Sequence, residues 1–378
     1  MKILIIDSAN ITLHYTVPFC NAFINKGISI KLLCSNNQKK SDYMYEIYSF
    51  FNIDNILFFK KIFRGINYFI GSVRAISYVK KNSIDVVHFQ ISPLPIIDIF
   101  VVLILKKYAL VGATIHNTTP FHGTSGTLIQ RIGFKKLISK YDFLICHTKY
   151  SSNVLQNDYH IDNKKISIIE HPLFKKVKNP RYTDVKKYIS TNKILFFGTI
   201  SEYKGIDILI NALGELPNSL KEKTILTIAG KSLMKNIILK KQAIKLGVDQ
   251  YIHWKEGWIK DKEVEDLFLN NDIIIMPYRH IDGSGVLVQA LENNLPVIAS
   301  DIGGFQDLIE NEKTGLLFKA NDHIHLSKCI SKIFDNPNLL KNISKSMHEK
   351  ALNMPTWDNL VEISMNSYKN AKNRQTKN

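Results

Sequence analysis

Residues 272–300 read DIIIMPYRHIDGSGVLVQALENNLPVIAS, and this stretch decides the fold of the second half of the chain. The apolar strand DIIIMPY is followed by a turn with two glycines, an apolar helix and a second strand, PVIAS. Strand, turn, helix and strand form a βαβ unit with parallel strands. Because the first N–H groups of a helix have no partner inside the helix, this turn is suited to hold an anion.

The same alternation of strands and crossovers runs through both halves of the chain. KILIID, ISIKLLC, VVHFQ, ATIH, FLICHT and KISIIEH are strand-like in the first half; KILFFGT, LTIAGK, YIHWKEG, DIIIMPY, PVIAS and GLLF are strand-like in the second. Continuous apolar strands joined by long crossovers predict parallel sheets that are covered on both faces. We therefore predict an α/β fold of two doubly wound, Rossmann-like domains facing each other across a cleft.

The charged stretch 171–193 contains two prolines and interrupts this alternation. It predicts a boundary between a first domain at 1–175 and a second at 193–355, with a linker at 176–192. Residues 356–378 form an amphipathic segment beyond the second sheet, which could pack back on the first domain.

Composition indicates a globular chain of 378 residues, with 45% hydrophobic and 22% charged residues. We expect no secretory signal, since MKILIID leads directly into a strand. The longest apolar run, 94–105, carries Asp98 and is shorter than the roughly 20 residues that cross a bilayer, so it predicts a buried helix. The four cysteines show no CxxC spacing, so neither a zinc site nor a disulfide framework is indicated, and the chain fits a reducing cytoplasm.

The formal net charge of +17 lies mostly in the first half of the chain, where residues 1–180 hold 23 Lys and Arg against 10 Asp and Glu. Two stretches, 58–81 and 128–141, mix basic with aromatic and aliphatic residues at helical spacing. This pattern predicts contact with an anionic membrane surface, although solvated surface helices of a lysine-rich protein explain it as well. No nucleic-acid-binding module accompanies the charge, so we expect no nucleic acid partner.

Ligands of open parallel sheets bind outside the carboxyl ends of the strands, and the first candidate there is FFGTISEYKGIDILINAL, 196–213. A strand ends at Gly198, and a helix with a buried apolar stripe begins after Lys204 and Gly205. A cation beside a helix N-terminus suits a diphosphate. Taken alone, such a lysine is more often a solvated surface residue.

The second candidate is the turn at Gly283, Ser284 and Gly285, after which Val286 begins the helix. Its backbone can approach a ligand closely, and Gln289, one helical turn further on, is placed to reach ribose hydroxyls. The alternative is a plain turn with a surface glutamine.

The first half offers polar residues after its strands. His116 stands at the carboxyl end of the strand ATIH, which suits substrate contact or charge stabilisation, or else a structural histidine. Asn10 and His14 follow the first strand and are suited to hold a polar acceptor, or to cap the next helix.

The segments DVVHFQ, ATIHN, ICHTKYSSNVL, KISIIEHP, FFGTISEYKGIDILINAL, LTIAGK and SGVLVQALENNLPVIASDIGG occur in an order that resembles the GT-B glycosyltransferases. The resemblance is to the retaining family 4, glycosyl transferases group 1, of bacterial polysaccharide and lipopolysaccharide biosynthesis, and it covers residues 1 to about 370. It implies that the second domain binds a nucleotide-sugar donor and that the first domain binds the acceptor. The residues implicated in donor binding are Gly198, Thr199, Lys204, Trp258, Ile259, Arg279, Asp282, Gly283, Ser284, Gly285, Val286 and Gln289.

Within that set, the resemblance implies particular roles. Lys204 holds the donor diphosphate, the N–H groups of residues 284–286 also face it, and the base rests near Trp258 and Ile259. His116 contacts the transferred sugar, and Asn10 and His14 lie on the acceptor side. His116 and Lys204 are the expected catalytic residues.

The sequence departs from the family pattern at two points. The family commonly has two glutamates eight residues apart around the glycine turn, where this chain has Ile281, next to Asp282, and Gln289. It also often has an arginine shortly before the lysine, where this chain has Thr199 and Ser201, so Arg279 would have to supply that charge.

The favoured function is a hexosyltransferase that moves a sugar from a nucleotide-diphosphate sugar to a glycan or lipid-linked acceptor in bacterial surface polysaccharide, lipopolysaccharide or capsule biosynthesis. The family implies retention at the anomeric carbon and a cytoplasmic enzyme, peripheral on the inner face of the cell membrane if the basic helices contact lipid. Because the chain contains no Asp-x-Asp, we expect no metal, and no cofactor apart from the nucleotide-sugar co-substrate. The alternatives are a sugar-nucleotide epimerase of similar build and a non-catalytic partner subunit.

Overall fold

The computed structural model describes residues 1–10, 12–35, 46–51, 60–119, 128–178 and 191–376. The chain divides into two compact units, each treated by itself below. Unit 1 comprises Met1–Phe121, Ser125–Pro172 and Pro355–Asn378, and unit 2 contains Leu173–Met354. The main part of unit 1 ends at Pro172 and unit 2 ends at Met354, against predicted positions of 175 and 355, whereas unit 2 begins at Leu173 and includes the predicted linker 176–192. Most of that linker, at 179–190, lies outside the described residues.

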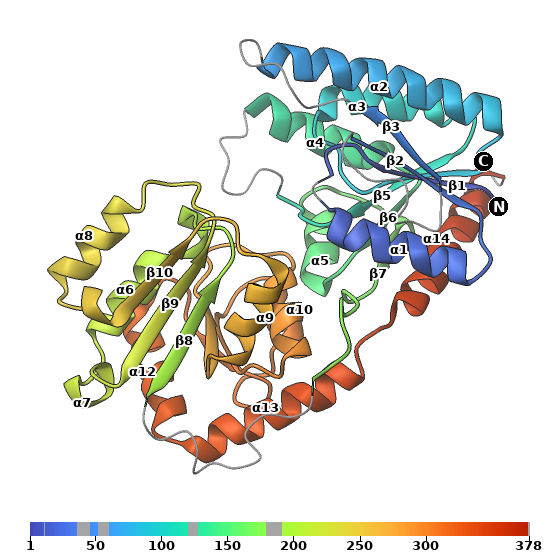
Figure 1. The fold of residues 1–378 in the computed structure, drawn as a ribbon. Coiled ribbons are helices and arrows are strands. Elements are labelled where there is room, and N and C mark those ends of the chain that lie inside the picture. The colour runs from blue at the N-terminus through green and yellow to red at the C-terminus, as the bar shows by residue number, and fades with distance from the viewer. Residues whose placement is uncertain (11, 36–45, 52–59, 120–127, 179–190, 377–378) are drawn as a thin grey trace. The chain divides into compact units, whose positions relative to one another are not determined.

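Unit 1 is a parallel sheet of seven strands in the order β3-β2-β1-β4-β5-β6-β7 (Figure 1). Its elements are β1 (Ile3–Asp7), α1 (Leu13–Asn25), β2 (Ile30–Ser35), β3 (Glu46–Phe51), α2 (Lys60–Asn82), β4 (Val86–Phe89), α3 (Pro95–Leu105), β5 (Leu110–Ile115), α4 (Leu128–Lys140), β6 (Phe143–Cys146), α5 (Lys149–Asn157), β7 (Ile166–Ile168) and α14 (Trp357–Gln375).

Helices α2, α3 and α4 pack on one face of this sheet, and α1 and α14 pack on the other (Figure 1). A buried histidine fixes the last helix to the sheet. His88 of β4 lies 2.7 Å through Nδ1 from the Tyr368 hydroxyl of α14, and 2.8 Å through Nε2 from the Thr114 hydroxyl of β5. The C-terminal segment therefore belongs to the core of unit 1.

Unit 2 is a parallel sheet of six strands in the order β10-β9-β8-β11-β12-β13, with one continuous apolar core. Its elements are β8 (Asn192–Phe197), the 3-10 turn η4 (Glu202–Lys204), α6 (Ile206–Gly214), α7 (Asn218–Lys221), β9 (Thr224–Gly230), α8 (Ile237–Lys245), β10 (Ile252–Glu256), α9 (Asp261–Leu269), β11 (Ile273–Met276), α10 (Gly285–Glu292), β12 (Val297–Ser300), α11 (Gly304–Leu308), β13 (Leu316–Phe318), α12 (His323–Phe334) and α13 (Pro337–Leu352).

The predicted fold of two doubly wound parallel sheets is confirmed, and every strand-like segment named from the sequence lies in a strand. The sequence prediction missed β3, the edge strand of unit 1. It was also wrong about α3, which is only half buried: Phe100 is 65% exposed although Val102 is fully buried. Within the described residues, no helix combines the length and apolarity that crossing a bilayer requires.

Candidate functional site

The strand order of unit 2 places a topological switch point between β8 and β11, because the connections from these neighbouring strands run in opposite directions. Ligands of doubly wound sheets bind at such a point, outside the carboxyl ends of the strands. Gly198 directly follows β8, and Tyr278 lies two residues after β11. The candidate donor site is therefore built around these two residues.

Lys204 reaches this point from η4. Its side chain is buried, its ammonium donates a hydrogen bond to the Tyr278 hydroxyl at 3.1 Å, and it lies 4.7 Å from the centre of the Tyr278 ring. Burial lowers the pKa of Lys204, and no ion pair of the described residues includes it. A buried cation without a carboxylate partner is costly, and a bound anion would supply the missing charge.

Gly198 and Gly205 allow this close packing. A Cβ on Gly198 would lie 2.8 Å from the Lys204 ammonium and 3.6 Å from the Val286 side chain, so the predicted residues 198, 204 and 286 do meet. Gly205 has a φ of +65°, and a Cβ there would lie 1.9 Å from the Pro277 carbonyl oxygen. Both positions require glycine.

Helix α10 begins beside this group. Ser284 is its N-cap, and its hydroxyl accepts a hydrogen bond from the Leu287 N–H at 3.2 Å. A Cβ on Gly283 would meet no atom within 4 Å, and one on Gly285 would meet only the Phe174 ring at 3.9 Å. Packing among the described residues therefore does not explain these two glycines, and space is left beside the helix N-terminus.

Two polar side chains in this region lack partners among the described residues. The Oε1 atom of Gln289, one turn into α10, is buried without a hydrogen bond, and so is the hydroxyl of Ser201, just before η4. An unpaired buried acceptor costs free energy unless a ligand donates to it. A hydroxyl group of a bound ligand would satisfy Gln289.

Arg279 is engaged elsewhere, which argues against its predicted role. Its guanidinium forms two hydrogen bonds to the Asp207 carboxylate, at 2.7 and 3.0 Å, and a third to the Glu202 carbonyl oxygen at 2.6 Å. Because its charge is already paired, it does not replace the arginine that the family often has before Lys204.

The remaining predicted donor residues are less connected. Thr199 is half-buried next to Gly198, and Asp282 is buried before the glycine turn. Trp258 is 84% exposed beyond β10, and Ile259 beside it is buried. No hydrogen bond or ring contact among the described residues joins Trp258 to Lys204.

Unit 1 carries a second group of polar residues at the carboxyl edge of its sheet. A polar side chain follows or ends each of five strands: Asp7 of β1, Gln90 after β4, His116 after β5, His147 after β6 and His171 after β7. Tyr15 of α1 packs among three of them, with ring centres 4.8 Å from His116, 5.1 Å from His147 and 5.2 Å from His171. We call these six residues the edge cluster.

Burial favours the neutral form of four histidines of this unit. It lowers the pKa of His147 to about 4 and that of His171 and His88 to about 3, and it holds the pKa of His116 well below its ordinary value, with His147 adding to the effect. His116 Nε2 lies 3.1 Å from Gln90 Oε1 and donates to it as a neutral imidazole. His116 is therefore suited to hydrogen bonding, and charge stabilisation by an imidazolium is disfavoured.

The edge cluster keeps some hydrogen-bonding capacity unused. His147 donates through Nδ1 to the Ile169 carbonyl oxygen at 3.0 Å, which leaves Nε2 as a buried acceptor without a partner among the described residues. The Gln90 amide nitrogen and the Tyr15 hydroxyl are likewise buried, and neither forms a hydrogen bond with another described residue. Unsatisfied groups from three elements at one edge suit a polyhydroxylated ligand.

Asn10 has a structural partner. Its side chain accepts from the Ser35 N–H at 3.0 Å and donates to the Ser35 carbonyl oxygen at 3.3 Å, which ties β1 to β2. It does not cap α1, whose N-cap is Thr12. His14 is exposed on the first turn of α1.

Sequence reasoning missed Tyr278, Gln90, His147, His171 and Tyr15. Gln90, His147 and His171 lie at or near the carboxyl end of a strand-like segment, as His116 does, so the rule that selected His116 would also have selected them. Tyr278 lay inside the strand-like segment DIIIMPY, and Tyr15 carried no local signal.

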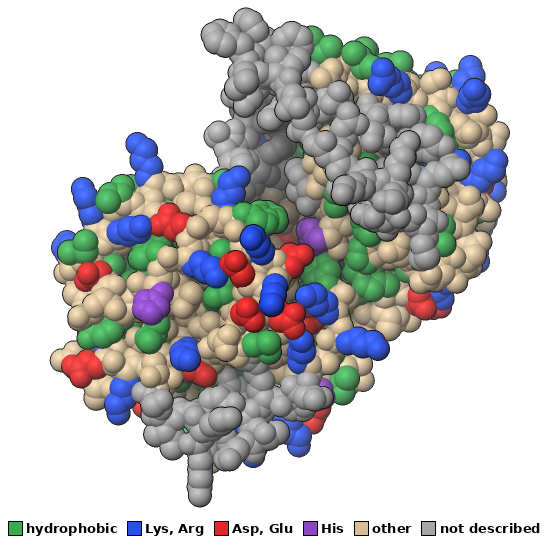
Figure 2. Space-filling model, in the orientation of Figure 1, with side chains coloured by type: hydrophobic (Ala, Val, Ile, Leu, Met, Phe, Trp, Pro, Cys, Tyr) green, Lys and Arg blue, Asp and Glu red, His purple; other side chains and the backbone are tan. Residues whose placement is uncertain are grey.

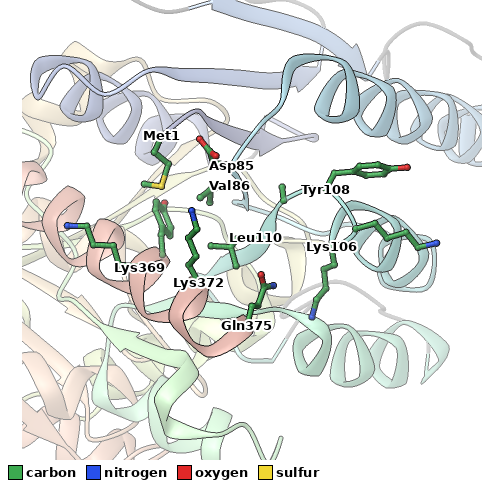
Figure 3. Close-up of a pocket in the computed structure, with 12 residues that line it drawn as sticks. Met1, Asp85, Val86, Lys106, Tyr108, Leu110, Lys369, Lys372 and Gln375 are labelled. Atoms are coloured by element: carbon green, nitrogen blue, oxygen red, sulfur yellow. The ribbon is translucent and has the colours of Figure 1, made fainter. Parts of the chain in front are cut away.

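A pocket of about 540 Å³ lies at the opposite, amino-terminal edge of the unit 1 sheet (Figure 3). Val86 and Leu110, the first residues of β4 and β5, line it together with four lysines: Lys106, Lys107, Lys369 and Lys372. Lys106 forms an ion pair with Asp142 at 2.8 Å. The pocket is separate from the edge cluster.

No group of three or more His, Cys, Asp or Glu side chains in the described part of the chain is arranged to hold a metal ion.

Two sheets of Rossmann strand order in one chain, with a cation and a helix N-terminus at the second switch point, define the GT-B class. The family model "Glycosyltransferase Family 4" matches residues 14–173, and the model "Glycosyl transferases group 1" matches residues 183–350. The chain therefore belongs to the GT-B glycosyltransferases of family 4.

Individual relatives are distant. A D-inositol 3-phosphate glycosyltransferase of Streptomyces bingchenggensis is 23% identical over 64% of this chain, and the match spans only 55% of that relative. HepE of Anabaena, solved with UDP-glucose, has a TM-score of 0.73 at 13% identity, with 99% of this chain and 100% of that one covered. WaaG, a glycosyltransferase involved in lipopolysaccharide biosynthesis, has a TM-score of 0.67 at 16% identity, with 94% and 96% covered.

Proposed function

We propose that the protein transfers a sugar from a nucleotide-diphosphate sugar to a glycan or lipid-linked acceptor in bacterial surface polysaccharide biosynthesis. The observation that carries this proposal is Lys204, a buried and unpaired ammonium between Gly198 and Tyr278 at the switch point of unit 2. The neighbouring N-terminus of α10 adds N–H groups, and the space at Gly283 and Gly285 lets a diphosphate approach them. HepE, the structural neighbour solved with UDP-glucose, supports a nucleotide-sugar donor.

In the proposed reaction, the bond between the anomeric carbon and the diphosphate oxygen breaks. The acceptor hydroxyl oxygen bonds to that carbon, and its proton passes to the leaving phosphate on the same face, which gives retention. Lys204 and the α10 N–H groups stabilise the charge that develops on the leaving diphosphate. We assign this task to them without a metal ion.

The other residues take supporting roles in this proposal. Gln289 accepts a hydrogen bond from a ribose hydroxyl through its unpaired Oε1, and Trp258 with Ile259 lies on the side of the base. His116 holds a hydroxyl of the transferred sugar as a neutral imidazole. The other residues of the edge cluster bind the acceptor. The reaction takes place in the cytoplasm.

Thermal-shift measurements with a panel of nucleoside diphosphates and nucleotide sugars, with and without Mg²⁺, test the donor site. We expect one nucleotide to raise the melting temperature without Mg²⁺, because a ligand that binds only the folded state stabilises it by about 2.7 kcal/mol at a hundredfold excess over its dissociation constant. A shift that requires Mg²⁺ would contradict the metal-independent assignment. No shift with any nucleotide would favour a non-catalytic partner, and turnover of the nucleotide sugar to its epimer without acceptor would favour an epimerase.

A further inference from the structure

The helices on one face of the unit 1 sheet expose an unusual amount of apolar surface. Among the described side chains of α2, α3 and α4, nine large hydrophobic ones are each at least 40% exposed; we call them the apolar patch: Ile66, Phe69, Ile70, Val73, Ile96, Phe100, Leu103, Ile104 and Ile132. Single exposed hydrophobic residues are normal on soluble proteins. Nine of them on helices that contact each other mark a surface that binds something.

The patch is regular along each helix. Ile66, Phe69, Ile70 and Val73 of α2 follow helical spacing, as do Ile96, Phe100, Leu103 and Ile104 of α3. Both helices bury a second apolar stripe against the sheet, which includes Tyr68 and Ala75 of α2 and Val101, Val102 and Leu105 of α3. A helix that is apolar on both sides is normally covered on both sides.

A buried hydrogen bond fixes the two helices under the patch. The Tyr68 hydroxyl of α2 donates to Asp98 Oδ1 of α3 at 2.5 Å, and Asp98 is fully buried. Because both partners are inside, the outer stripes of α2 and α3 are held in register as one surface.

The charge around the patch selects its partner. Helices α2, α3 and α4 contain one carboxylate, the buried Asp98. The exposed basic residues on or directly after their described parts are Arg74, Lys80, Lys81, Lys107, Arg131, Lys135, Lys136 and Lys140. Figure 2 shows Lys and Arg side chains beside hydrophobic ones over α2. The first residues of the basic stretch 58–81 lie outside the described residues.

We infer that the apolar patch inserts into the acyl boundary of an anionic bilayer while its basic rim contacts the lipid phosphates. A net positive rim without exposed carboxylates complements anionic lipid, and apolar side chains projecting between these cations suit the interface of a bilayer. The binding is therefore partly hydrophobic, which the basic residues alone would not give. The inference deepens the proposed function, because it brings the enzyme to a lipid-linked acceptor.

Vesicle sedimentation of the full chain tests this, with phosphatidylglycerol in phosphatidylcholine as the probe. The test variant is Phe100→Ser with Leu103→Ser, both on the exposed side of α3. The matched control is Ile238→Ser with Ile244→Ser on α8 of unit 2, where the side chains are 62% and 63% exposed. Partition is measured at low salt and at about 1 M NaCl, where the Debye length is about 3 Å.

We expect the wild-type chain and the control variant to keep a measurable share of their binding at high salt. The α3 variant should bind at least about tenfold less at both salt concentrations, because it loses the inserted apolar area. Equal binding of the α3 variant and the wild-type chain would overturn the inference, as would complete loss of wild-type binding at high salt. A wild-type dimer that becomes monomeric in the α3 variant, with no vesicle binding by either, would assign the patch to a second copy instead.

Nucleotide-induced thermal shifts of the same variants, without vesicles, keep this inference separate from the proposed function. We expect both variants to retain the wild-type shift, since α3 belongs to unit 1 and the Ile238 and Ile244 side chains of α8 are exposed to solvent. If the wild-type chain binds vesicles but no nucleotide shifts its melting temperature, only the donor site is contradicted. If a nucleotide shifts the melting temperature but the chain does not bind vesicles, only the membrane inference is contradicted.

Discussion

Replacing Lys204 with Met should have opposite effects on ligand binding and on the stability of the free protein. Met keeps most of the apolar stem against Tyr278 but removes the ammonium group, which lies at 3.1 Å from the Tyr278 hydroxyl and is buried. In the free protein this charge has no carboxylate partner among the described residues, and burial lowers its pKa. Its removal therefore relieves a desolvation penalty that a bound diphosphate would otherwise offset.

The size of each effect can be estimated. A hydrogen bond to a charged group contributes about 1.5–3 kcal/mol, so loss of the contact with a diphosphate should weaken nucleotide binding by about 10- to 150-fold. In the free protein the lost hydrogen bond and cation–π contact with Tyr278 contribute about 1–2 kcal/mol, and relief of the buried charge is of similar size with the opposite sign. We expect the melting temperature of the free variant to stay within about 4 °C of the wild-type value, or to rise.

The assay is isothermal titration with the nucleotide that gives the largest thermal shift, alongside melting of the free proteins. Lys245→Met on α8 is the matched control, because Lys245 is an exposed lysine at the C-terminal end of a helix in the same unit. It should leave both quantities unchanged. Unchanged nucleotide affinity in Lys204→Met would refute the reasoning. A fall of about 10 °C or more in the melting temperature of the free variant would also refute it and make Lys204 a structural residue.

Three further predictions concern both units. His116→Ala should lower turnover by at least about tenfold with little change in donor affinity, and His116→Asn should recover part of it, since a neutral hydrogen bond is the expected role; equal turnover in all three proteins would remove His116 from the site. The three histidines with pKa values of about 3 to 4 should destabilise unit 1 as pH falls below about 6.5, by about 1.4 kcal/mol per histidine per pH unit, while Asp98, whose pKa burial raises to about 7, offsets the effect of one histidine. Calorimetry at pH 7.5 and 5.5 should therefore show a lower melting temperature of unit 1 at pH 5.5, and an unchanged transition would contradict the burial argument. Gly205→Ala should destabilise unit 2 by about 3 kcal/mol or more, because φ is +65° and the new Cβ would meet the Pro277 carbonyl, whereas Gly214→Ala, with no atom closer than 3.6 Å, should cost under about 1 kcal/mol in urea unfolding.

The fold followed from the sequence because apolar strands and crossovers are local patterns. β3 was missed because EIYSFF is short and Glu46 and Ser49 interrupt its apolar residues, so it lacks the continuous apolar run of the central strands. It lies at the edge of the sheet, where one side of the strand is unpaired. α3 was taken as buried because its composition is apolar, and composition does not show which side of a helix a protein leaves open. The sequence allowed residues 356–378 to pack back on the first domain, but the contacts that hold α14 there are in no local pattern; one is the hydrogen bond between His88 and Tyr368, 280 residues apart.

The two candidate sites differ in how much the sequence could show. Around Lys204, the geometry comes from glycines, a helix start and one cation within short spans of chain, so spacing identified them. The contact of Lys204 with Tyr278 and the pairing of Arg279 with Asp207 had to be seen in the structure. The edge cluster gathers single polar residues from five strands and α1, and each is ordinary in its own segment.

The two sites should differ in how well they tolerate amino-acid substitutions. At Gly198 and Gly205 a single added methyl group collides with the Lys204 ammonium or with backbone, so substitution there disrupts the unit as well as the site. His147 is tied by one hydrogen bond to the Ile169 carbonyl, and its other nitrogen is unused among the described residues. Under the proposed function, exchange of His147 for another polar residue should therefore change which acceptor hydroxyl groups bind at this edge, at a modest cost in stability. Under the proposed function, we expect acceptor preference to change with single substitutions in the edge cluster, whereas the packing at Gly198 and Gly205 constrains the diphosphate end of unit 2.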